Sequence, residues 1–155
     1  MPVVATLCMI QKDGKILLQR KAKGRFGEGK WNMPGGKVKD GETCFEAVRR
    51  EVFEETGLKV EKLSEVGKVN FFFENSSEPV WVVHIFAAKI FSGTEMPSEE
   101  GLLEWFDIKN LPFNEMWPDD KYWYPMLLSG KHFEGDFHYT KGFEKLLSYR
   151  LREIK

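Results

Sequence analysis

One segment of this chain, residues 36–58, carries a spaced set of glycines, carboxylates and one arginine that helix formation by itself does not require. Thr43 and Glu46 fit a capping box and Gly57 fits a C-terminal stop, so the segment predicts a helix over residues 43–56. At about 100° per residue, three acids of this helix share roughly one third of its circumference, beside its apolar stripe: Glu51, Glu54 and Glu55. The acids are therefore expected at the rim of the core.

These three like charges repel one another, and no lysine stands four residues after Glu51 or Glu54 to offset the repulsion. A solvated acidic helix face is the ordinary interpretation of such a run. The alternative is a site for a hard cation, because Mg²⁺ takes oxygen ligands, keeps several waters and is usually completed by substrate phosphates. The spacing of the acids favours the second interpretation.

That spacing matches the Nudix signature, whose fixed positions are filled here by Gly36, Glu42, Arg50, Glu51, Glu54, Glu55 and Gly57. Val52 and Leu58 supply apolar residues at the positions where the signature needs them. The chain thus resembles the Nudix hydrolases. The resemblance implies an α+β fold, an α/β/α sandwich with a mixed β-sheet. It also implies a loop–helix–loop element that binds Mg²⁺, or Mn²⁺, and hydrolyses a nucleoside diphosphate linked to another group. The residues alone indicate a glycine-turned loop and a carboxylate-bearing helix that hold a metal against a polyphosphate.

Length and composition predict one domain over residues 1–155, since the chain has the common single-domain size and no linker-like or repeated segment. No apolar run approaches the ~20 residues of a membrane span, and the N-terminus lacks the pattern of a signal peptide. The two cysteines, Cys8 and Cys44, have no disulfide-framework spacing. We therefore expect a cytoplasmic protein that works without a membrane and as a monomer.

The charged residues of the chain indicate what kind of molecule it binds. With 23 Lys and Arg against 24 Asp and Glu, the net charge of −1 gives no general attraction to nucleic-acid polymers. Basic residues nevertheless gather just before the glycine loop: Arg20, Lys21, Lys23, Arg25 and Lys30. A small polyanion such as a nucleoside triphosphate is the expected partner.

Apolar runs and turn signals predict strands over residues 3–10, 15–20, 66–73, 80–91, 103–106, 132–139 and 146–154. A second helix is predicted over residues 119–128, although Pro125 lies inside it. Residues 21–41 hold six of the fourteen glycines and should form a long ordered loop with a function.

A large flat ring stands beside two adjacent carboxylates where Trp117 precedes Pro118, Asp119 and Asp120. Helix capping explains such acids in most proteins, with the indole as a core or rim aromatic. The same residues could instead recognise a base, because an indole stacks on its face and carboxyls bond its edge.

The glycine loop and residues 117–120 are similar to the branch of the family that hydrolyses oxidised purine nucleoside triphosphates, and the similarity runs over about residues 6–153. It implies that a purine is held by Asn32, Trp117, Asp119 and Asp120, beside Pro118, in a pocket walled by Phe26, Phe71 and Trp81. Sugar and phosphates would lie near Thr6, Lys21, Pro34, Gly35, Gly36 and Lys37. The implied metal ligands are the Gly35 carbonyl, Glu51, Glu54, Glu55 and Glu100. The chain differs from this branch of the family at Met33-Pro34 and at Trp81, and both differences touch the implied purine pocket.

The implied reaction is metal-assisted attack of water on a phosphorus, giving a nucleoside monophosphate and pyrophosphate. Arg50 is expected to orient the glutamates, while the general base stays open among Glu51, Glu54, Glu55 and Glu100. Two alternatives remain: a substrate other than oxidised purines, such as a methylated or unmodified purine triphosphate, a dinucleotide polyphosphate or a capped RNA end, or a nucleotide-binding module without turnover.

Overall fold

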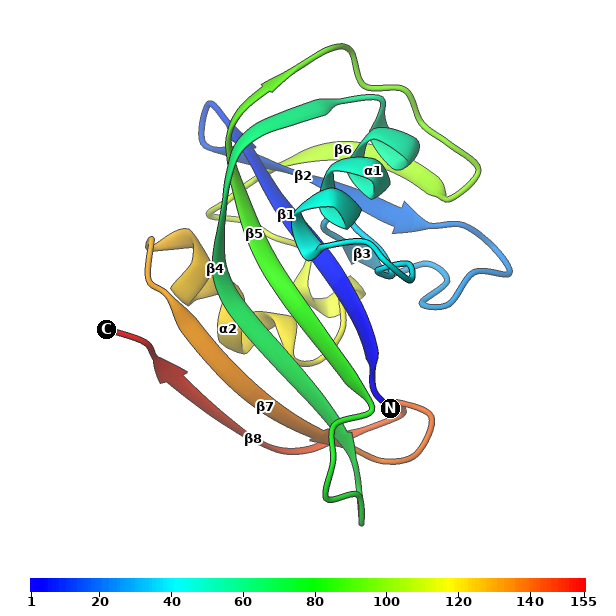
Figure 1. Cartoon of the computed structure of the whole chain (residues 1–155), viewed down its shortest axis with the longest axis vertical. Coiled ribbons are helices and arrows are strands. Elements are labelled where there is room, and N and C mark those ends of the chain that lie inside the picture. The colour runs from blue at the N-terminus through cyan, green and yellow to red at the C-terminus, as the bar shows by residue number, and fades with distance from the viewer.

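A mixed β-sheet forms the centre of the molecule in the computed structural model, which describes residues 1–155 (Figure 1). The elements follow in the order β1 (Val3–Lys12), β2 (Lys15–Lys21), β3 (Trp31–Asn32), α1 (Cys44–Thr56), β4 (Lys59–Phe73), β5 (Trp81–Ser92), β6 (Gly101–Asp107), the 3₁₀ helix η1 (Phe113–Glu115), α2 (Asp120–Leu128), β7 (Phe133–Tyr139) and β8 (Leu146–Glu153).

The eight strands lie in the order β3-β2-β1-β5-β4-β7-β8, and β6 pairs with the other side of β2. The β1–β5 and β4–β7 pairs are parallel and the remaining pairs are antiparallel. β1 pairs with β2 only next to their turn, through Gln11 with Ile16 and Lys12 with Lys15. Beyond that point β1 and β2 separate, which leaves an edge of β1 open to another segment.

The glycine loop takes this open edge of β1. Two carbonyls of the loop accept hydrogen bonds from β1: Gly36 O from Thr6 N and Pro34 O from Cys8 N, each 2.8 Å long. In the opposite direction, Val38 N of the loop donates to Val4 O at 2.9 Å. The loop is therefore fixed like a short extra strand, and it delivers Gly35 and Gly36 to the gap between β1 and β2.

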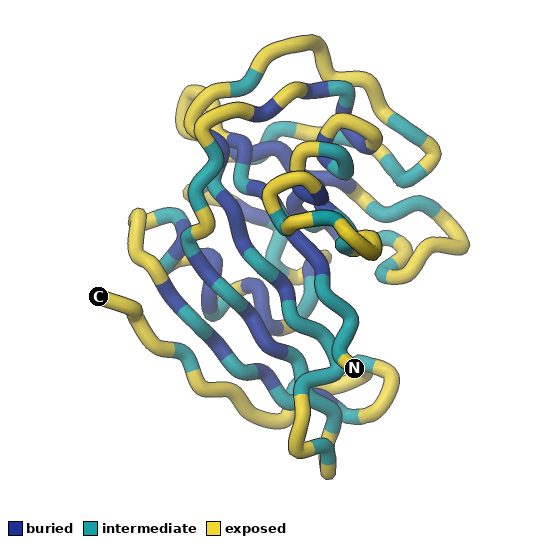
Figure 2. The backbone as a smooth tube through the Cα atoms, in the orientation of Figure 1, coloured by how far each residue is buried: buried dark blue, intermediate teal, exposed yellow.

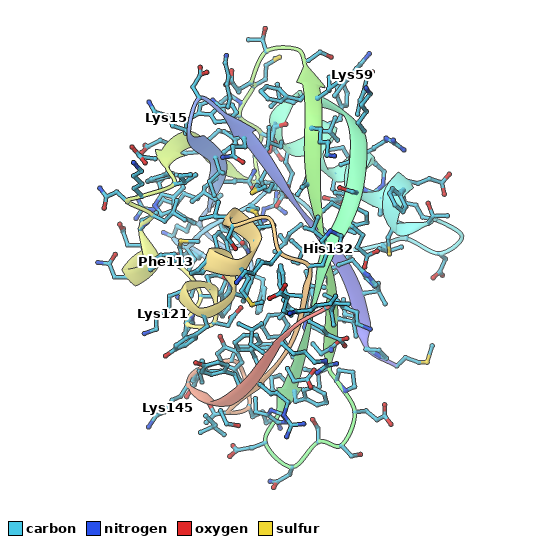
Figure 3. All side chains as sticks on the ribbon, turned by 90° about the vertical axis from the view of Figure 1, so that its left-hand side faces the viewer. Lys15, Lys59, Phe113, Lys121, His132 and Lys145 are labelled. Atoms are coloured by element: carbon cyan, nitrogen blue, oxygen red, sulfur yellow. The ribbon has the colours of Figure 1, made fainter.

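The two α-helices lie on opposite faces of the sheet (Figures 1 and 3). α1 packs Val48 and Val52 into a cluster of 9 buried residues that also includes Cys8 and Leu17. On the other face α2 contributes Trp123 to a cluster of 16 buried residues. In Figure 2 the buried residues lie mainly along the strands, and the exposed residues lie mainly in the loops. None of the helices is long and apolar enough to cross a membrane.

The predicted α+β fold, helices on both faces of a mixed sheet, is confirmed. α1 has the predicted caps: Thr43 and Glu46 form a capping box, and Gly57 ends the helix at φ 79°. β4 begins at Lys59, seven residues earlier than predicted, because its first part is polar and a register shift between Glu65 and Gly67 interrupts its alternation. β6 is longer than predicted, and the short β3 within the loop had no pattern of its own.

Candidate active site

A cavity of about 460 Å³ opens between the sheet, the glycine loop and α2. Apolar side chains of β1, β4 and β5 form its floor, among them Ala5, Val69 and Val83. One end reaches through the gap between β1 and β2 to Glu51 and Glu55 of α1, and the other end reaches the residues around the start of α2. The cavity therefore joins the two groups of residues that the sequence singled out separately.

Arg50 organises the acidic end. Its Nε and Nη2 donate to the Glu42 carboxylate at 2.7 and 2.9 Å, and Nη1 donates to Glu51 at 2.7 Å and Glu54 at 3.1 Å. Nη2 also donates to the Lys37 carbonyl of the glycine loop at 3.1 Å. The guanidinium lowers the pKa of Glu42 to about 2, so this carboxylate stays charged. Arg50 thus supplies the positive charge that the helix itself lacks and locks the loop to α1.

Glu55 differs from the other acids because it is buried. Its carboxylate accepts the Gly35 N–H at 2.9 Å and the Lys21 ammonium at 3.4 Å. Burial raises its pKa to about 7, against the opposing effects of Lys21 and the Gly35 N–H. Lys21 is held from the other side by Gln19 Oε1 at 3.2 Å. Glu55 therefore titrates near neutral pH beside a fixed cation.

Close approach explains both glycines of the loop. A Cβ atom at Gly35 would collide with the backbone carbonyl of Thr6, and one at Gly36 would collide with the Glu51 carboxylate. Space requires glycine at Gly35, because the loop lies directly against the backbone of β1, whereas a Cβ at Gly36 would displace the flexible Glu51 carboxylate.

The expected metal ligands are only partly brought together. Glu51, Glu55 and Glu100 line the cavity with Gly35, whereas the side chain of Glu54 is 53% exposed and lies outside the cavity wall, held by Arg50. Glu100 forms an ion pair with Arg25 at 3.4 Å. No three of the acids are arranged around a single point in the structure.

The other end of the cavity holds Asp119 and Asp120, each 2% exposed. Asp119 does not cap α2: its carboxylate accepts the Tyr139 hydroxyl at 2.5 Å and Trp123 Nε1 at 2.8 Å. Asn32 lies nearby, and its Oδ1 accepts from the Met33 N–H and the Tyr124 hydroxyl at 2.9 and 3.1 Å. Side-chain capping therefore does not explain Asp119, while Asp120 stands in the first turn of α2.

Asp120 is left without a comparable partner, since its Oδ2 is buried and makes no hydrogen bond. Burial and the adjacent Asp119 raise the pKa of Asp120 well above its ordinary value. Burial raises the pKa of Asp119 too, but the donors on Tyr139 and Trp123 oppose the rise. Asp120 is therefore the acid of the pair that is protonated more readily, and in its neutral form it can donate a proton to a ligand, whereas the donors on Tyr139 and Trp123 favour the ionised form of Asp119.

Aromatic rings form the mouth above this end. Phe26 stacks on Trp117 with ring centroids 5.3 Å apart and on Trp81 at 5.9 Å. Lys30 Nζ lies 5.2 Å from the centroid of Trp117, and Lys37 Nζ lies 5.6 Å from that of Trp81. The mouth combines flat apolar surfaces with positive charge, which suits a base carrying phosphates.

Most of the predicted site residues line this cavity: Thr6, Lys21, Phe26, Asn32, Gly35, Gly36, Lys37, Glu51, Glu55, Phe71, Trp81, Glu100, Trp117, Asp119 and Asp120. Pro34 and Pro118 lie outside its wall: Pro34 pairs with β1 through its carbonyl, and Pro118 is exposed. Met33, which the sequence similarity places at the pocket, and Arg25 of the basic group also line the cavity. The structure adds residues that the sequence had not indicated: Ala5, Leu7, Val69, Val83, Ile85, Trp123, Tyr139 and Phe143. For Trp123 the sequence held a usable signal, because Trp123 stands four residues after Asp119 on a predicted helix, and residues at this spacing are neighbours on the helix surface.

Comparison with known proteins agrees with this geometry. The NUDIX domain matches residues 1–127, and the chain belongs to the Nudix hydrolase family. It is 44% identical over 149 residues to an oxidized purine nucleoside triphosphate hydrolase of Mus musculus, covering 96% of this chain and 94% of that protein. A protein of the same description from Danio rerio is 41% identical, covering 97% and 94%. The crystal structure of a MutT protein from Bacillus halodurans is 34% identical, with a TM-score of 0.84 over 96% of this chain and 97% of that one.

Proposed function

We propose that this protein hydrolyses oxidised purine nucleoside triphosphates, such as 8-oxo-dGTP and 2-oxo-dATP, to the nucleoside monophosphate and pyrophosphate. The observation that carries the proposal is one continuous cavity with a buried Asp119–Asp120 pair at one end and Glu51 and Glu55 at the other. The relatives in Mus musculus and Danio rerio, whose descriptions name oxidised purine nucleoside triphosphates, support it. Such hydrolysis would remove damaged nucleotides before they enter DNA.

Base recognition follows from the unequal acids. A neutral Asp120 offers a donor and an acceptor, while Asp119, whose two oxygens already accept from Trp123 and Tyr139, would act as an acceptor only. The Asn32 amide adds donors, because its Oδ1 is already engaged by Met33 and Tyr124. Trp117 would stack on the face of the purine. Together these groups can match the carbonyl and amine edges of an oxidised purine.

The acidic end has the ligand chemistry of a divalent-cation site, since the carboxylates of Glu51, Glu55 and Glu100 and the carbonyl of Gly35 offer oxygen ligands there, and Arg50 holds Glu54 just outside the cavity wall. Nudix hydrolases depend on divalent metal ions, and we propose Mg²⁺, with Mn²⁺ as a substitute of similar ligand preference. When bound, the ion would lower the pKa of an attacking water and neutralise charge on the leaving pyrophosphate.

The protein's own residues would hold the phosphates and the acids in place. Arg50 fixes the orientation of Glu51 and Glu54, and it tethers α1 to the glycine loop. Lys21, held by Gln19, presents its ammonium beside Glu55 at the phosphate side of the cavity. The raised pKa of Glu55 makes it the acid best suited to exchange a proton near neutral pH, and so a candidate general base.

We further propose that residues 1–155 act as a single domain and as a monomer, in the cytoplasm, on a free nucleotide and not on a nucleic-acid polymer. The net charge of −1 supports the last point. Both ends of the cavity come from this one chain, and β7 and β8 continue the same sheet beyond residue 127. These features support a self-sufficient site.

A pyrophosphate-release assay tests the proposal. The purified protein with Mg²⁺ should hydrolyse 8-oxo-dGTP and 2-oxo-dATP with a kcat/KM at least about tenfold above that for dGTP and dATP, because the polar groups of the pocket match the oxidised edges. A preference for a dinucleotide polyphosphate, a capped RNA end or an unmodified nucleotide would replace the proposed substrate. Nucleotide binding without any product would indicate the non-catalytic alternative.

A further inference from the structure

The turn between β7 and β8 carries an aromatic residue in a conformation that side chains rarely adopt. Gly142 and Phe143 have consecutive positive φ angles of 83° and 61°. Hydrogen bonds hold the turn, from Phe143 N to Thr140 O at 3.0 Å and from Thr140 N to Lys145 O at 2.8 Å. Of the four non-glycine residues with positive φ, Phe143 is the only one that lines the cavity. Backbone strain of this kind concentrates at functional sites.

The ring of Phe143 meets the mouth of the cavity edge-on. Its centroid lies 5.9 Å from Phe26 and 6.0 Å from Trp117, with an interplanar angle of 71° in both cases. It also packs against Phe73 at 4.8 Å, Tyr139 at 5.4 Å and Phe71 at 6.1 Å. Phe143 is therefore a wall of the cavity at the corner where Phe26 and Trp117 stack on each other.

The five aromatic neighbours of Phe143 do not enclose its side chain completely. Phe143 remains half-buried, and it is part of the cavity wall. The turn itself lies at the surface, near Lys145 in Figure 3, where residues 141 and 142 are exposed. A ligand that enters between the turn and the mouth would cover the remaining face of the ring and add an aromatic contact.

From this geometry we infer that Phe143 is a substrate-binding residue: its ring contacts the purine that Trp117 and Asp119 hold, and closes the base site from the C-terminal hairpin. The inference rests on the proposed function, since it assigns a further residue to the same base site. The turn keeps a strained backbone because that conformation directs the ring at the ligand.

The test is calorimetric binding of the product nucleotide 8-oxo-dGMP in EDTA, which separates base affinity from turnover and from metal. Phe143→Ala and Phe143→Asn both remove the ring, but asparagine tolerates positive φ and alanine does not. We expect both variants to lose at least about tenfold in affinity, as for removal of one stacking partner. We also expect Phe143→Asn to have the higher Tm of the two.

Phe73→Leu is the matched control, because Phe73 contacts Phe143 from outside the cavity. It should lower the Tm and leave the Kd for 8-oxo-dGMP within about twofold of the wild type, since no ring is lost from the base site. Wild-type affinity in Phe143→Ala and Phe143→Asn would overturn the inference and leave the proposed function intact. Failure of the wild type itself to bind 8-oxo-dGMP would overturn both.

Discussion

Asp119 and Asp120 are neighbours in the sequence and equally buried, yet their surroundings differ. Tyr139 and Trp123 donate to both oxygens of Asp119, whereas Asp120 Oδ2 has no partner. A buried carboxylate without donors is costly to ionise, and the adjacent charge on Asp119 adds to that cost. The protein therefore keeps an unpaired acid in its interior, where it lowers stability and is available to a ligand.

This difference predicts how stability depends on pH. The folded-state pKa of Asp120 is raised above the unfolded value of about 3.9, so between these two values the folded protein holds a proton that the unfolded chain releases. Stability due to this group is complete below about pH 3.9 and falls as pH rises, by up to about 1.4 kcal/mol per unit.

Asp120→Asn removes this titration. Relative to the wild type, the variant should gain at least about 1 kcal/mol in free energy of unfolding between about pH 4 and pH 6, measured by urea denaturation. The control is Asp136→Asn, on the face of β7 where Asp136 accepts from Asn70. A difference between wild type and Asp120→Asn that stays constant with pH would show that Asp120 is ionised in the folded protein.

At the scale of elements, the glycine loop and α1 form one unit, because Arg50 and Glu55 of the helix bind the loop backbone. Gly36→Ala should therefore reduce kcat at least about tenfold, since the new Cβ displaces the Glu51 carboxylate from its position. The Tm should fall little, because the Glu51 side chain can move toward solvent.

Gly130→Ala is the control for Gly36→Ala, because it should change stability and leave kcat unchanged. Gly130 has φ 79°, and a Cβ atom added there would meet no other atom within 4 Å, so alanine strains only the backbone. The variant should lose about 1 kcal/mol of stability and keep wild-type kcat. If Gly36→Ala instead matched Gly130→Ala in both properties, the loop would have no role in placing Glu51.

Sequence patterns over a few neighbouring residues predicted those helices and strands whose ends depend on such residues. The capping box of Thr43 and Glu46 and the stop at Gly57 fixed the bounds of α1 closely. The start of β4 was missed because its alternation breaks at the Glu65–Gly67 register shift. The path of the glycine loop along β1 depends on pairing between Thr6 and Gly36, thirty residues apart, and no short-range pattern encodes it.

At the scale of the whole molecule, the fold is held by two clusters of buried side chains on either side of the sheet, and the acidic end contributes none of its charged groups to them. Treatment with EDTA should therefore abolish hydrolysis while the far-UV circular dichroism and Tm change little, because a substrate-completed metal site adds little to folding. Unfolding on chelation would instead indicate a structural metal.

The site as a whole could be predicted only in parts. Sequence similarity pointed to most of the cavity-lining residues, but Tyr139 and Phe143 belong to β7 and the turn after it, far from the signature segment. The sheet brings them to Asp119 and Trp117 through the parallel β4–β7 pairing. Such long-range pairing assembles this end of the cavity, the proposed base site, and the sequence carries no direct signal for it.

The central claim is that the buried Asp119–Asp120 pair recognises an oxidised purine inside the cavity that also holds the catalytic acids. The most direct test is the ratio of kcat/KM for 8-oxo-dGTP over 2-oxo-dATP in the wild type, Asp119→Asn and Asp120→Asn. Asparagine fixes which atoms donate and accept, so each variant should change this ratio at least about tenfold, or about 1.4 kcal/mol. An unchanged ratio in both variants, with each protein folded, would contradict the claim.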